Sequence, residues 1–328
     1  MIVQLFTGFF ALLSTILIVS ANPVKRSIPK INNEPIIGIL SQELIPGLYS
    51  SYSNEYDSYI AASYIKFVEG AGAQAVPIWI GKNSTYYEDI MSKLNGVLFP
   101  GGDVNFFVSN GYADAGDIIY KIAKRYNDNG DYFPILGICL GFELLTYLSA
   151  NRVEHRTNCT SVCQAIPLNF TPVFNQSKLF GSTSEKIINI LKTDNVTANY
   201  HNYCVTKSDL ERVNLTDSLR VMSLNNDENG LEFISTIEDK KYPFYGLQFH
   251  PEKNDYEWVK GRNIPHSRNA TIINQYFADF LVIEARKNFH KFEDEEEKLK
   301  TLIYNYNPTY TGLKKSLMIQ SYFFKTTS

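Results

Sequence analysis

Residues 134–148 read PILGICLGFELLTYL, and this stretch decides the fold. Pro134 to Ile138 is a short apolar run of the kind expected for a strand covered on both faces of a sheet. Residues 142–148 are helical in character, and only Cys139-Leu140-Gly141 separates them from the run. The sequence therefore predicts a buried strand that turns sharply into a helix.

The same alternation of apolar runs and amphipathic stretches recurs along the first half of the chain. Further buried strands are predicted at 35–40, 75–80 and 96–99, and helices at 59–68 and 117–126. Strands separated by helices form parallel sheets, so we expect an α/β fold with a doubly wound, mostly parallel sheet flanked by helices. Such sheets place their sites beyond the carboxyl ends of the strands.

The second half of the chain is less regular. Residues 233–237 and 245–249 are predicted strands, and the polar turn 238–241 between them predicts an antiparallel hairpin added to the sheet. Residues 272–287 predict a long helix. The acidic run 293–297 is interpreted as a solvated helix face or loop.

Composition is that of an ordinary globular protein. The chain has 31 Lys+Arg against 34 Asp+Glu, a net charge of −3, and 44% hydrophobic residues, which excludes a disordered or coiled-coil chain. There is no basic surplus, so we expect no nucleic-acid partner. Without repeats or a Gly/Ser/Pro-rich linker, a single domain is predicted over 35–328, elaborated between 150 and 230, after a linker at 22–34.

The first 21 residues differ from the rest of the chain. From Ile2 to Val19 they are almost wholly apolar or small, and Val19-Ser20-Ala21 offers the small residues that a signal peptidase requires. We predict a signal peptide over 1–21, cleaved after Ala21. A membrane anchor is the alternative, because ~18 apolar residues can just span a bilayer. The mature protein is expected in the secretory pathway without a membrane anchor.

Glycosylation motifs agree with a location in the secretory pathway. N-x-S/T sequons occur seven times, where composition alone would give about four. Five of the seven lie between 158 and 214, so this stretch is expected to present surface loops. The predicted acceptors are Asn83, Asn158, Asn169, Asn175, Asn195, Asn214 and Asn269.

Four cysteines are too few for a disulfide scaffold. A Cys159–Cys163 or a Cys163–Cys204 bridge is compatible with the sequence, which does not choose between them. His155, Cys159 and Cys163 are spaced in a way that invites a zinc hypothesis, but the usual C-x2-C knuckle and a fourth ligand are missing. We expect neither a metal nor a cofactor.

Cys139 is the candidate nucleophile. It lies between Gly137 and Gly141 in a G-x-C-x-G pattern at the predicted strand-to-helix turn, where flanking glycines avoid a clash. The helix N-terminus there favours the thiolate that acyl transfer needs. The alternative is a buried structural cysteine, a frequent place for this residue type.

A proton partner and an oxyanion hole are also predicted. His250 and Glu252, two residues apart in an extended segment, would project to the same side, so the carboxylate can orient the imidazole. The Pro100-Gly101-Gly102 turn leaves backbone amides uncovered. The amides of Gly101, Gly102 and Leu140 would bind a tetrahedral oxyanion, each contributing ~3–4 kcal/mol.

Together these motifs resemble the class I glutamine amidotransferases, and longer blocks resemble the γ-glutamyl hydrolase family. By this resemblance Cys139 is the nucleophile, His250 is the general acid/base, and the substrates are γ-glutamyl peptides, chiefly the polyglutamate tails of folates. The family also suggests a lysosomal or extracellular address and a homodimer. The blocks that carry the resemblance are 59–72, 130–145, 167–171, 232–238 and 242–258.

Two further residues are candidate substrate contacts. Glu143 stands where amidotransferases usually carry glutamine. Its carboxylate could pair with the α-ammonium of a γ-glutamyl residue, and the alternative is a helix-capping or packing role. His201 matches a site histidine of the family and, when protonated, would attract carboxylates; the alternative is a surface histidine without a role in the site. The following Asn202-Tyr203 departs from the family's lysine–tryptophan.

Three functions are weighed. The leading hypothesis is a cysteine hydrolase of γ-glutamyl bonds that works through an acyl-enzyme. A glutaminase is disfavoured because no synthetase domain accompanies it and the chain is predicted to be exported. A non-catalytic binding glycoprotein is disfavoured because it would not need Cys139, His250 and Glu252 together.

Overall fold

The computed structural model describes residues 30–313, 316 and 318–325. The predicted signal peptide at 1–21 lies outside these residues. Residues Ile31–Ser328 cluster as one compact unit. Among the described residues, no helix is long and apolar enough to cross a membrane.

An eight-stranded sheet forms the centre of the domain, in the order β4-β1-β5-β6-β12-β11-β10-β8. The five strands from β4 to β12 are parallel, and β11, β10 and β8 continue the sheet antiparallel. This confirms the doubly wound, mostly parallel sheet and the added β11–β12 hairpin. The strands are β4 (Gln74–Ile78), β1 (Ile36–Leu40), β5 (Gly96–Phe99), β6 (Ile135–Ile138), β12 (Phe244–Leu247), β11 (Glu232–Asp239), β10 (Leu219–Asn226) and β8 (Asn169–Phe170).

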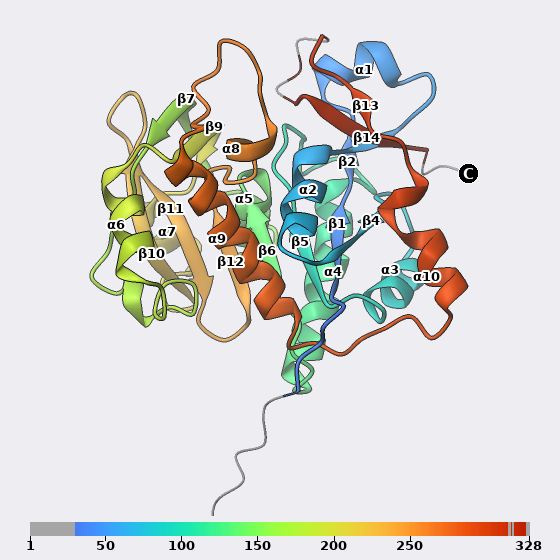
Figure 1. Cartoon of the computed structure of the whole chain (residues 1–328). Helices are drawn as coiled ribbons and strands as arrows, with labels where there is room; N and C mark the ends of the chain where they lie inside the picture. The colour runs from blue at the N-terminus through green and yellow to red at the C-terminus, as the bar shows by residue number, and fades with distance from the viewer. Residues whose placement is uncertain (1–29, 314–315, 317, 326–328) are drawn as a thin grey trace, which may run out of the picture. The chain divides into compact units, whose positions relative to one another are not determined.

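Helices cover both faces of this sheet (Figure 1). Along β1, alternate side chains enter different cores: Ile37 and Ile39 pack with α2 and α9, whereas Ile36 and Leu40 pack with α3 and α4. This two-sided burial explains why β1 is a continuous apolar run. The covering helices are α2 (Ala62–Gly70) and α9 (Arg268–Ala285) on one face, and α3 (Ser84–Met91), α4 (Tyr112–Asp128) and α5 (Leu140–Ser149) on the other.

The predicted helix at 59–68 begins too early. Ser58–Ala61 is a strand, β3, and α2 starts only at Ala62. β3 pairs antiparallel with β14 (Gln320–Phe324) and with β2 (Gln42–Glu43). A backbone partner some 260 residues away along the chain decides the conformation here, and local periodicity cannot reveal such a partner.

An antiparallel ribbon of β7 (Thr157–Ile166) and β9 (Thr197–Cys204) fills the elaborated region and carries residues of the site described below. The other elements are short. They are α1 (Pro46–Tyr52), η1 (Phe174–Gln176), α6 (Glu185–Thr193), α7 (Lys207–Arg212), α8 (Lys253–Tyr256), α10 (Glu295–Thr301), η2 (Ile303–Asn305) and β13 (Thr309–Tyr310).

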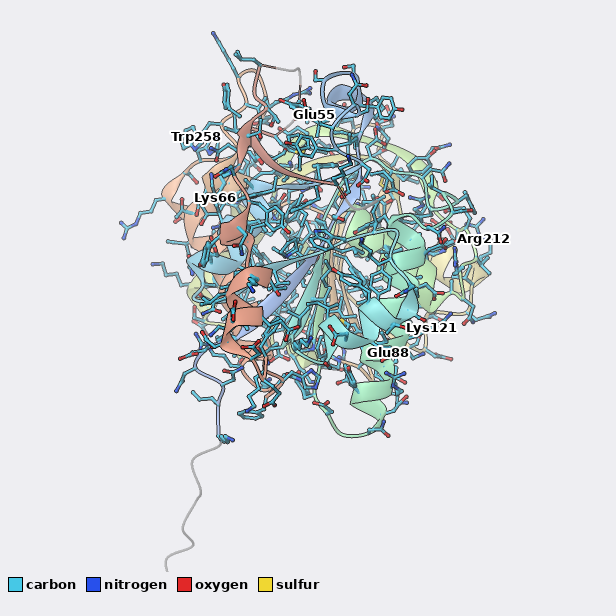
Figure 2. All side chains as sticks on the ribbon, turned by 90° about the vertical axis from the view of Figure 1, so that its right-hand side faces the viewer. Glu55, Lys66, Glu88, Lys121, Arg212 and Trp258 are labelled. Atoms are coloured by element: carbon cyan, nitrogen blue, oxygen red, sulfur yellow. A yellow bond between two sulfur atoms is a disulfide. The ribbon has the colours of Figure 1, made fainter. Side chains whose placement is uncertain are left out.

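Charged side chains lie mainly on the outer surface of these elements. Lys121 on α4 and Arg212 on α7 project outward (Figure 2), with side chains 70% and 59% exposed. The acidic run enters α10, whose first turn contains Glu295, Glu296 and Glu297. Acidic residues in a first turn favour helix formation, so the solvated helix face is confirmed.

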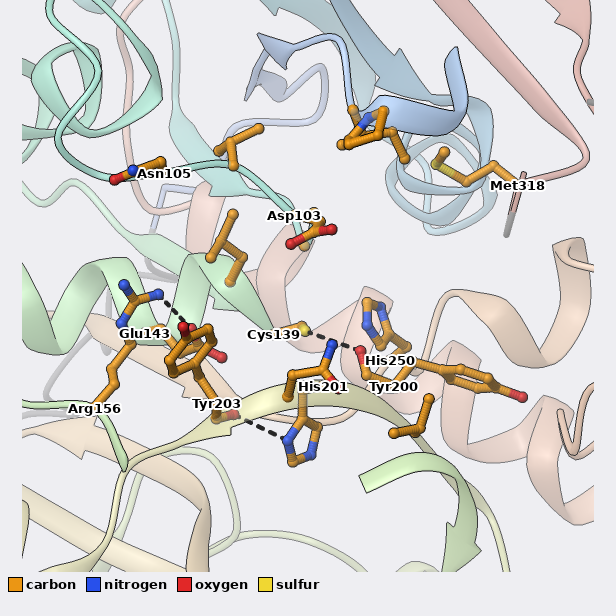
Figure 3. A pocket seen from close by; sticks show the side chains of 18 of the residues that line it. Asp103, Asn105, Cys139, Glu143, Arg156, Tyr200, His201, Tyr203, His250 and Met318 are labelled. Carbon is orange, nitrogen blue, oxygen red and sulfur yellow. Dashed lines mark hydrogen bonds and ion pairs between the residues drawn. The ribbon is translucent and has the colours of Figure 1, made fainter. Parts of the chain in front are cut away.

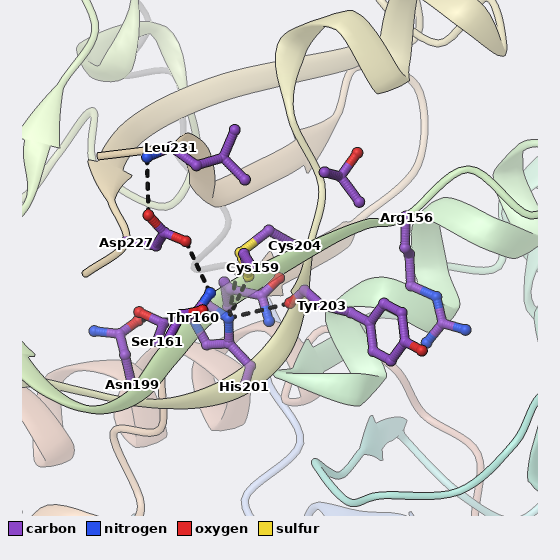
Figure 4. Close-up of a disulfide and its surroundings, with 12 residues drawn as sticks. Arg156, Cys159, Thr160, Ser161, Asn199, His201, Tyr203, Cys204, Asp227 and Leu231 are labelled. Atoms are coloured by element: carbon purple, nitrogen blue, oxygen red, sulfur yellow. Dashed lines mark hydrogen bonds between the residues drawn. A yellow bond between two sulfur atoms is a disulfide. The ribbon is translucent and has the colours of Figure 1, made fainter. Parts of the chain in front are cut away.

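The disulfide joins Cys159 to Cys204, and thus neither predicted pairing is correct. In the β7–β9 ladder Thr157 lies opposite Cys204, which brings the nearby Cys159 within bonding reach (Figure 4). Cys163 lies further along β7, and its sulfur accepts the Asn263 N–H. The pairing follows from strand register, which the spacing of cysteines does not encode.

Cys204→Ser should lower the free energy of unfolding by about 2–4 kcal/mol, because the bridge closes a loop with a sequence separation of 45. The measurement is urea unfolding under oxidising conditions. Cys163→Ser, which removes a thiol without a bridge, is the matched control and should change stability little. Equal stability of the two variants would contradict a stabilising role for the bridge.

Candidate active site

Cys139 lies at the junction of β6 and α5 in a strained backbone conformation. Its φ is 53° and its ψ is −110°, a region that non-glycine residues rarely adopt. A Cβ on Gly137 would lie 2.3 Å from Gly141 O, and one on Gly141 would lie 1.9 Å from Phe99 O. Only glycine fits at either flank, so the predicted sharp turn is confirmed and it raises the thiol above the sheet.

His250 follows β12, the strand that pairs with β6. Its Nδ1 lies 2.7 Å from Glu252 Oε1, and both side chains are buried. The segment is a turn and not the predicted extended stretch, since Glu252 has helical dihedrals and precedes α8. The predicted contact nevertheless exists. With the Nδ1 proton donated to the carboxylate, Nε2 carries the lone pair that a general base needs.

Gly101 follows β5, on the other side of β6, and completes a crowded junction. A Cβ on Gly101 would lie 2.6 Å from His250 Cε1 and 3.0 Å from Cys139 Cβ. Three neighbouring parallel strands therefore deliver the turn, the thiol and the imidazole to one point, as the topology of a doubly wound sheet predicts.

Tyr64 on α2 connects two parts of this junction, and the sequence reasoning missed it. Its hydroxyl oxygen accepts the Gly101 N–H at 2.8 Å and lies 3.2 Å from His250 Nδ1. Because the Nδ1–H donates to Glu252, Nδ1 has no lone pair for the Tyr64 hydroxyl, and Tyr64 Oη also faces this N–H as an acceptor. Tyr64 lies within the block 59–72 that resembles the hydrolase family. Its place in this block was the sequence signal that could have indicated a role in the site.

The predicted oxyanion donors differ in availability. The Gly101 N–H is already bound to Tyr64. The Leu140 N–H lies close enough to Cys139 to lower the pKa of the thiol. Within the described part of the chain no hydrogen bond engages the Gly102 N–H. In this structure the Gly102 N–H is therefore the donor without a partner among the described residues, and the Leu140 N–H faces the thiol itself.

Burial dominates the electrostatics of the thiol and the imidazole. It raises the pKa of Cys139 well above its ordinary value, and Glu143 adds to this, while Lys253 and the Leu140 N–H oppose it. Burial thus opposes the thiolate that the helix N-terminus was expected to favour. Burial also lowers the pKa of His250, against the opposing effect of Glu252. The resting pair is a neutral thiol and a neutral imidazole.

Glu252 retains its charge in this buried place. Burial alone would raise the pKa of its carboxyl, but interactions with His250, the nearby Lys253 and a backbone hydrogen bond together outweigh burial and hold the pKa below its ordinary value. A buried carboxylate beside the imidazole stabilises the imidazolium that forms when His250 accepts a proton.

These groups open into a pocket with a volume of about 680 Å³ (Figure 3). Cys139 and His250 lie in its wall, and the Cys139 sulfur is 3.9 Å from Tyr200 O. Acidic and basic side chains both face the cavity. The charged lining residues, apart from His201 and His250, are Asp103, Glu143, Glu154, Arg156, Lys253 and Arg262.

Glu143 lines the pocket, but both of its carboxylate oxygens have partners. Arg156 Nη1 lies 2.9 Å from Oε2, and Gln248 Nε2 donates to Oε1 at 3.1 Å. Arg156 also pairs with Glu154 and lies against the rings of Phe106 and Tyr203. A substrate ammonium would have to compete with this buried guanidinium, so the structure does not favour the expected contact with Glu143.

His201 is placed away from the reacting centre. Its imidazole lies on the far side of β9 from Cys139, where Nδ1 contacts Tyr203 O at 3.1 Å and Nε2 contacts Asn199 Oδ1 at 3.2 Å (Figures 3 and 4). Burial lowers the pKa of His201 to about 3. The ring is therefore neutral at ordinary pH, and the expected recognition of carboxylates by a protonated His201 is wrong.

One group of potential metal ligands occurs among the described residues. Cys159, Cys204 and His201 offer ligand atoms within 4.8 Å of one another, but the two sulfurs are joined in the disulfide and provide no thiolate. The sequence-based zinc set is dispersed: His155 contacts Val153 O and Thr146, whereas Cys163 contacts Asn263.

In fold and in chemistry the chain is thus a cysteine hydrolase with a doubly wound α/β sheet, because this sheet delivers one thiol and one imidazole–carboxylate pair to the same pocket. Comparison with known proteins defines it further. The family model described as Peptidase C26 matches residues 35–252, and the chain belongs to that family.

Curated relatives cover most of this chain. It is 40% identical over 304 residues to gamma-glutamyl hydrolase B of Dictyostelium discoideum, with 92% of this chain and 86% of the relative covered. It is 42% identical over 295 residues to gamma-glutamyl hydrolase of Rattus norvegicus (89% and 90% covered). It is 41% identical over 280 residues to gamma-glutamyl hydrolase of Homo sapiens (85% and 86% covered).

The contacts of Tyr64 predict a measurable role. Tyr64→Phe should reduce kcat about fivefold, because one hydrogen bond at the junction is worth about 1 kcal/mol, while KM stays nearly constant. The acid limb of the pH profile of kcat should move to lower pH, since the imidazolium loses an acceptor at Nδ1.

Tyr87→Phe is the matched control for this prediction. Tyr87 is also buried, and its hydroxyl donates to Trp79 O outside the pocket. This variant should keep both kcat and the pH profile. If Tyr64→Phe changed only the melting temperature, as a structural tyrosine would, its proposed influence on His250 would be refuted.

Proposed function

We propose that this protein hydrolyses γ-glutamyl peptide bonds. The observation that carries the proposal is the pocket that combines the Cys139 elbow with the His250–Glu252 pair, in a chain about 40% identical to gamma-glutamyl hydrolases over most of its length. A folate poly-γ-glutamate is the proposed natural substrate, as the family resemblance implies. The pocket is of a size that accommodates a ligand of this class.

The proposed reaction begins with the neutral pair. Cys139 Sγ attacks the side-chain carbonyl carbon of the glutamyl residue while His250 Nε2 accepts the thiol proton. The tetrahedral oxygen that forms receives hydrogen bonds from the N–H groups of Gly102 and Leu140. Collapse breaks the C–N bond, and His250 returns its proton to the leaving amine, which leaves a thioester on Cys139.

Water then completes the cycle. His250 removes a proton from a water molecule that attacks the thioester carbonyl, and the second tetrahedral intermediate expels Cys139, which recovers the proton. The products are a shortened chain that ends in a free γ-carboxylate and the released amine. Throughout both steps Glu252 orients the imidazole and stabilises its charged form.

The discriminating experiment is steady-state hydrolysis of three substrates by the purified protein. We expect turnover of a di-γ-glutamyl peptide, little turnover of free glutamine, and little turnover of the matched α-linked peptide. A mass increase on Cys139 after acid quench would show the thioester. Preferential hydrolysis of glutamine would support a glutaminase, and no turnover of any substrate would support a binding protein.

The secretory address is a further part of the proposal. The seven sequons support it, because six acceptor asparagines are exposed and only Asn269 is half-buried, with its amide donating to Asp194. The lowered pKa of His250 keeps the imidazole neutral in mildly acidic surroundings, as a lysosomal enzyme requires. A shift in electrophoretic mobility after treatment with an N-glycosidase tests the address. Light scattering tests the homodimer that the family resemblance suggests.

A further inference from the structure

The charges of the pocket are unequally satisfied. Arg156 is held by two carboxylates, Glu143 and Glu154. No described acidic group lies within ion-pair distance of the Lys253 ammonium, although this residue is only 6% exposed and lines the same cavity as Cys139. Burial of an ammonium without an ion-pair partner is unfavourable, so its position in the pocket wall indicates an anionic ligand.

The carboxylates nearest to Lys253 along the chain have other partners. Glu252 is bonded to His250, and Glu257 accepts the Ile319 N–H. Both carboxylates interact electrostatically with Lys253 without forming an ion pair with its ammonium. The centroid of the Tyr200 ring lies 6.0 Å from Lys253 Nζ. The positive charge of Lys253 also reaches the reacting groups, because it lowers the pKa of both Cys139 and His250.

We propose that Lys253 binds the free α-carboxylate of the glutamyl residue whose side-chain carbonyl is attacked by Cys139. This assignment rests on the proposed function. A γ-linked glutamyl residue carries an α-carboxylate three carbons from the scissile carbonyl, so a cation beside the nucleophile and the base can hold it while the carbonyl faces the thiol. Lys253 takes the role of carboxylate recognition that the sequence assigned to His201.

A cycle of two substrates and two enzymes tests the assignment. The substrates are a γ-glutamyl peptide and its analogue with the α-carboxylate converted to a carboxamide. Wild-type protein should prefer the carboxylate by about 10- to 100-fold in kcat/KM, the range of a charge-assisted hydrogen bond. For Lys253→Met this preference should fall to about one. If Lys253→Met lowers kcat/KM equally for both substrates, that loss reports the effect of Lys253 on the thiol. The ratio of the two kcat/KM values removes this common loss.

The ratio of kcat/KM for the carboxylate to kcat/KM for the carboxamide is independent of the fraction of correctly folded enzyme. It therefore stays informative if Lys253→Met is unstable. Lys253→Arg should keep part of the preference, since it keeps the charge. Lys260→Met is the matched control, because Lys260 is exposed seven positions further along and does not line the pocket; its ratio should equal that of wild type.

The two hypotheses fail in different ways. If wild-type protein prefers the carboxylate and Lys253→Met keeps that preference unchanged, the assignment to Lys253 is overturned while γ-glutamyl hydrolysis stands. If wild-type protein hydrolyses both substrates equally, no carboxylate is recognised and the assignment is also overturned. If wild-type protein hydrolyses neither substrate, the proposed function itself is refuted.

Discussion

Cys139→Ala should abolish turnover, with a loss of at least about a thousandfold in kcat, because the covalent route has no second nucleophile. The fold should persist, since alanine fits the elbow backbone as well as cysteine does and the side chain is small. The measurement is single-turnover hydrolysis of the γ-glutamyl substrate, with mass spectrometry of the quenched protein. Wild type should show the thioester adduct, and Cys139→Ala should show none.

Cys163→Ala provides the matched control for the nucleophile. Cys163 is the other cysteine outside the disulfide, and it does not line the pocket. This variant should form the adduct and turn over substrate as wild type does. Wild-type-like activity in Cys139→Ala would instead show that the thiol at the elbow is not the nucleophile.

His250→Asn should be nearly as damaging, with a loss of about 10²–10⁴-fold in kcat, the usual contribution of a general acid–base group. The imidazole must accept the thiol proton and later protonate the leaving amine, and asparagine can do neither. Burial lowers the pKa of His250 from its ordinary 6.5, so wild-type kcat/KM should fall only below that pH, where the ring becomes charged. This acid limb should be missing in His250→Asn.

Glu252→Gln separates the orienting role from the chemical one. The amide can still accept the Nδ1 proton, but it no longer stabilises the imidazolium, so the pKa of His250 should fall further and the acid limb should move to lower pH. Activity should lie between those of wild type and His250→Asn.

A loss of less than tenfold in His250→Asn would mean that another residue acts as the base.

Local patterns were sufficient where a structural feature depends on neighbouring residues. The run 134–138, the flanking Gly137 and Gly141, and the helix that follows predicted the turn at Cys139, because strand burial and the space that a glycine leaves are properties of a few consecutive residues. The proximity of His250 and Glu252 was also predicted, although through an extended segment that proved to be a turn.

Features that depend on distant partners were missed or misjudged. Ser58–Ala61 became a strand because β14 pairs with it, and the disulfide formed between Cys159 and Cys204 because of the β7–β9 register. His201 was expected to carry a charge, but burial on the far side of β9 removes it. Each outcome depends on burial or pairing between segments far apart in sequence, and periodicity and spacing do not report these.

By itself, the sequence determined the α/β architecture, the cysteine elbow and the residues able to perform acyl transfer, since these rest on local hydrophobic pattern and residue chemistry. Only the tertiary structure decided how those residues are used. Tyr64 meets His250 across 186 positions of chain, and Arg156 is neutralised by Glu143. Lys253 lines the pocket with no acidic partner among the residues that the structure describes. Charge and hydrogen-bond capacity are read from sequence, but their pairing is settled only when the chain brings distant groups into contact.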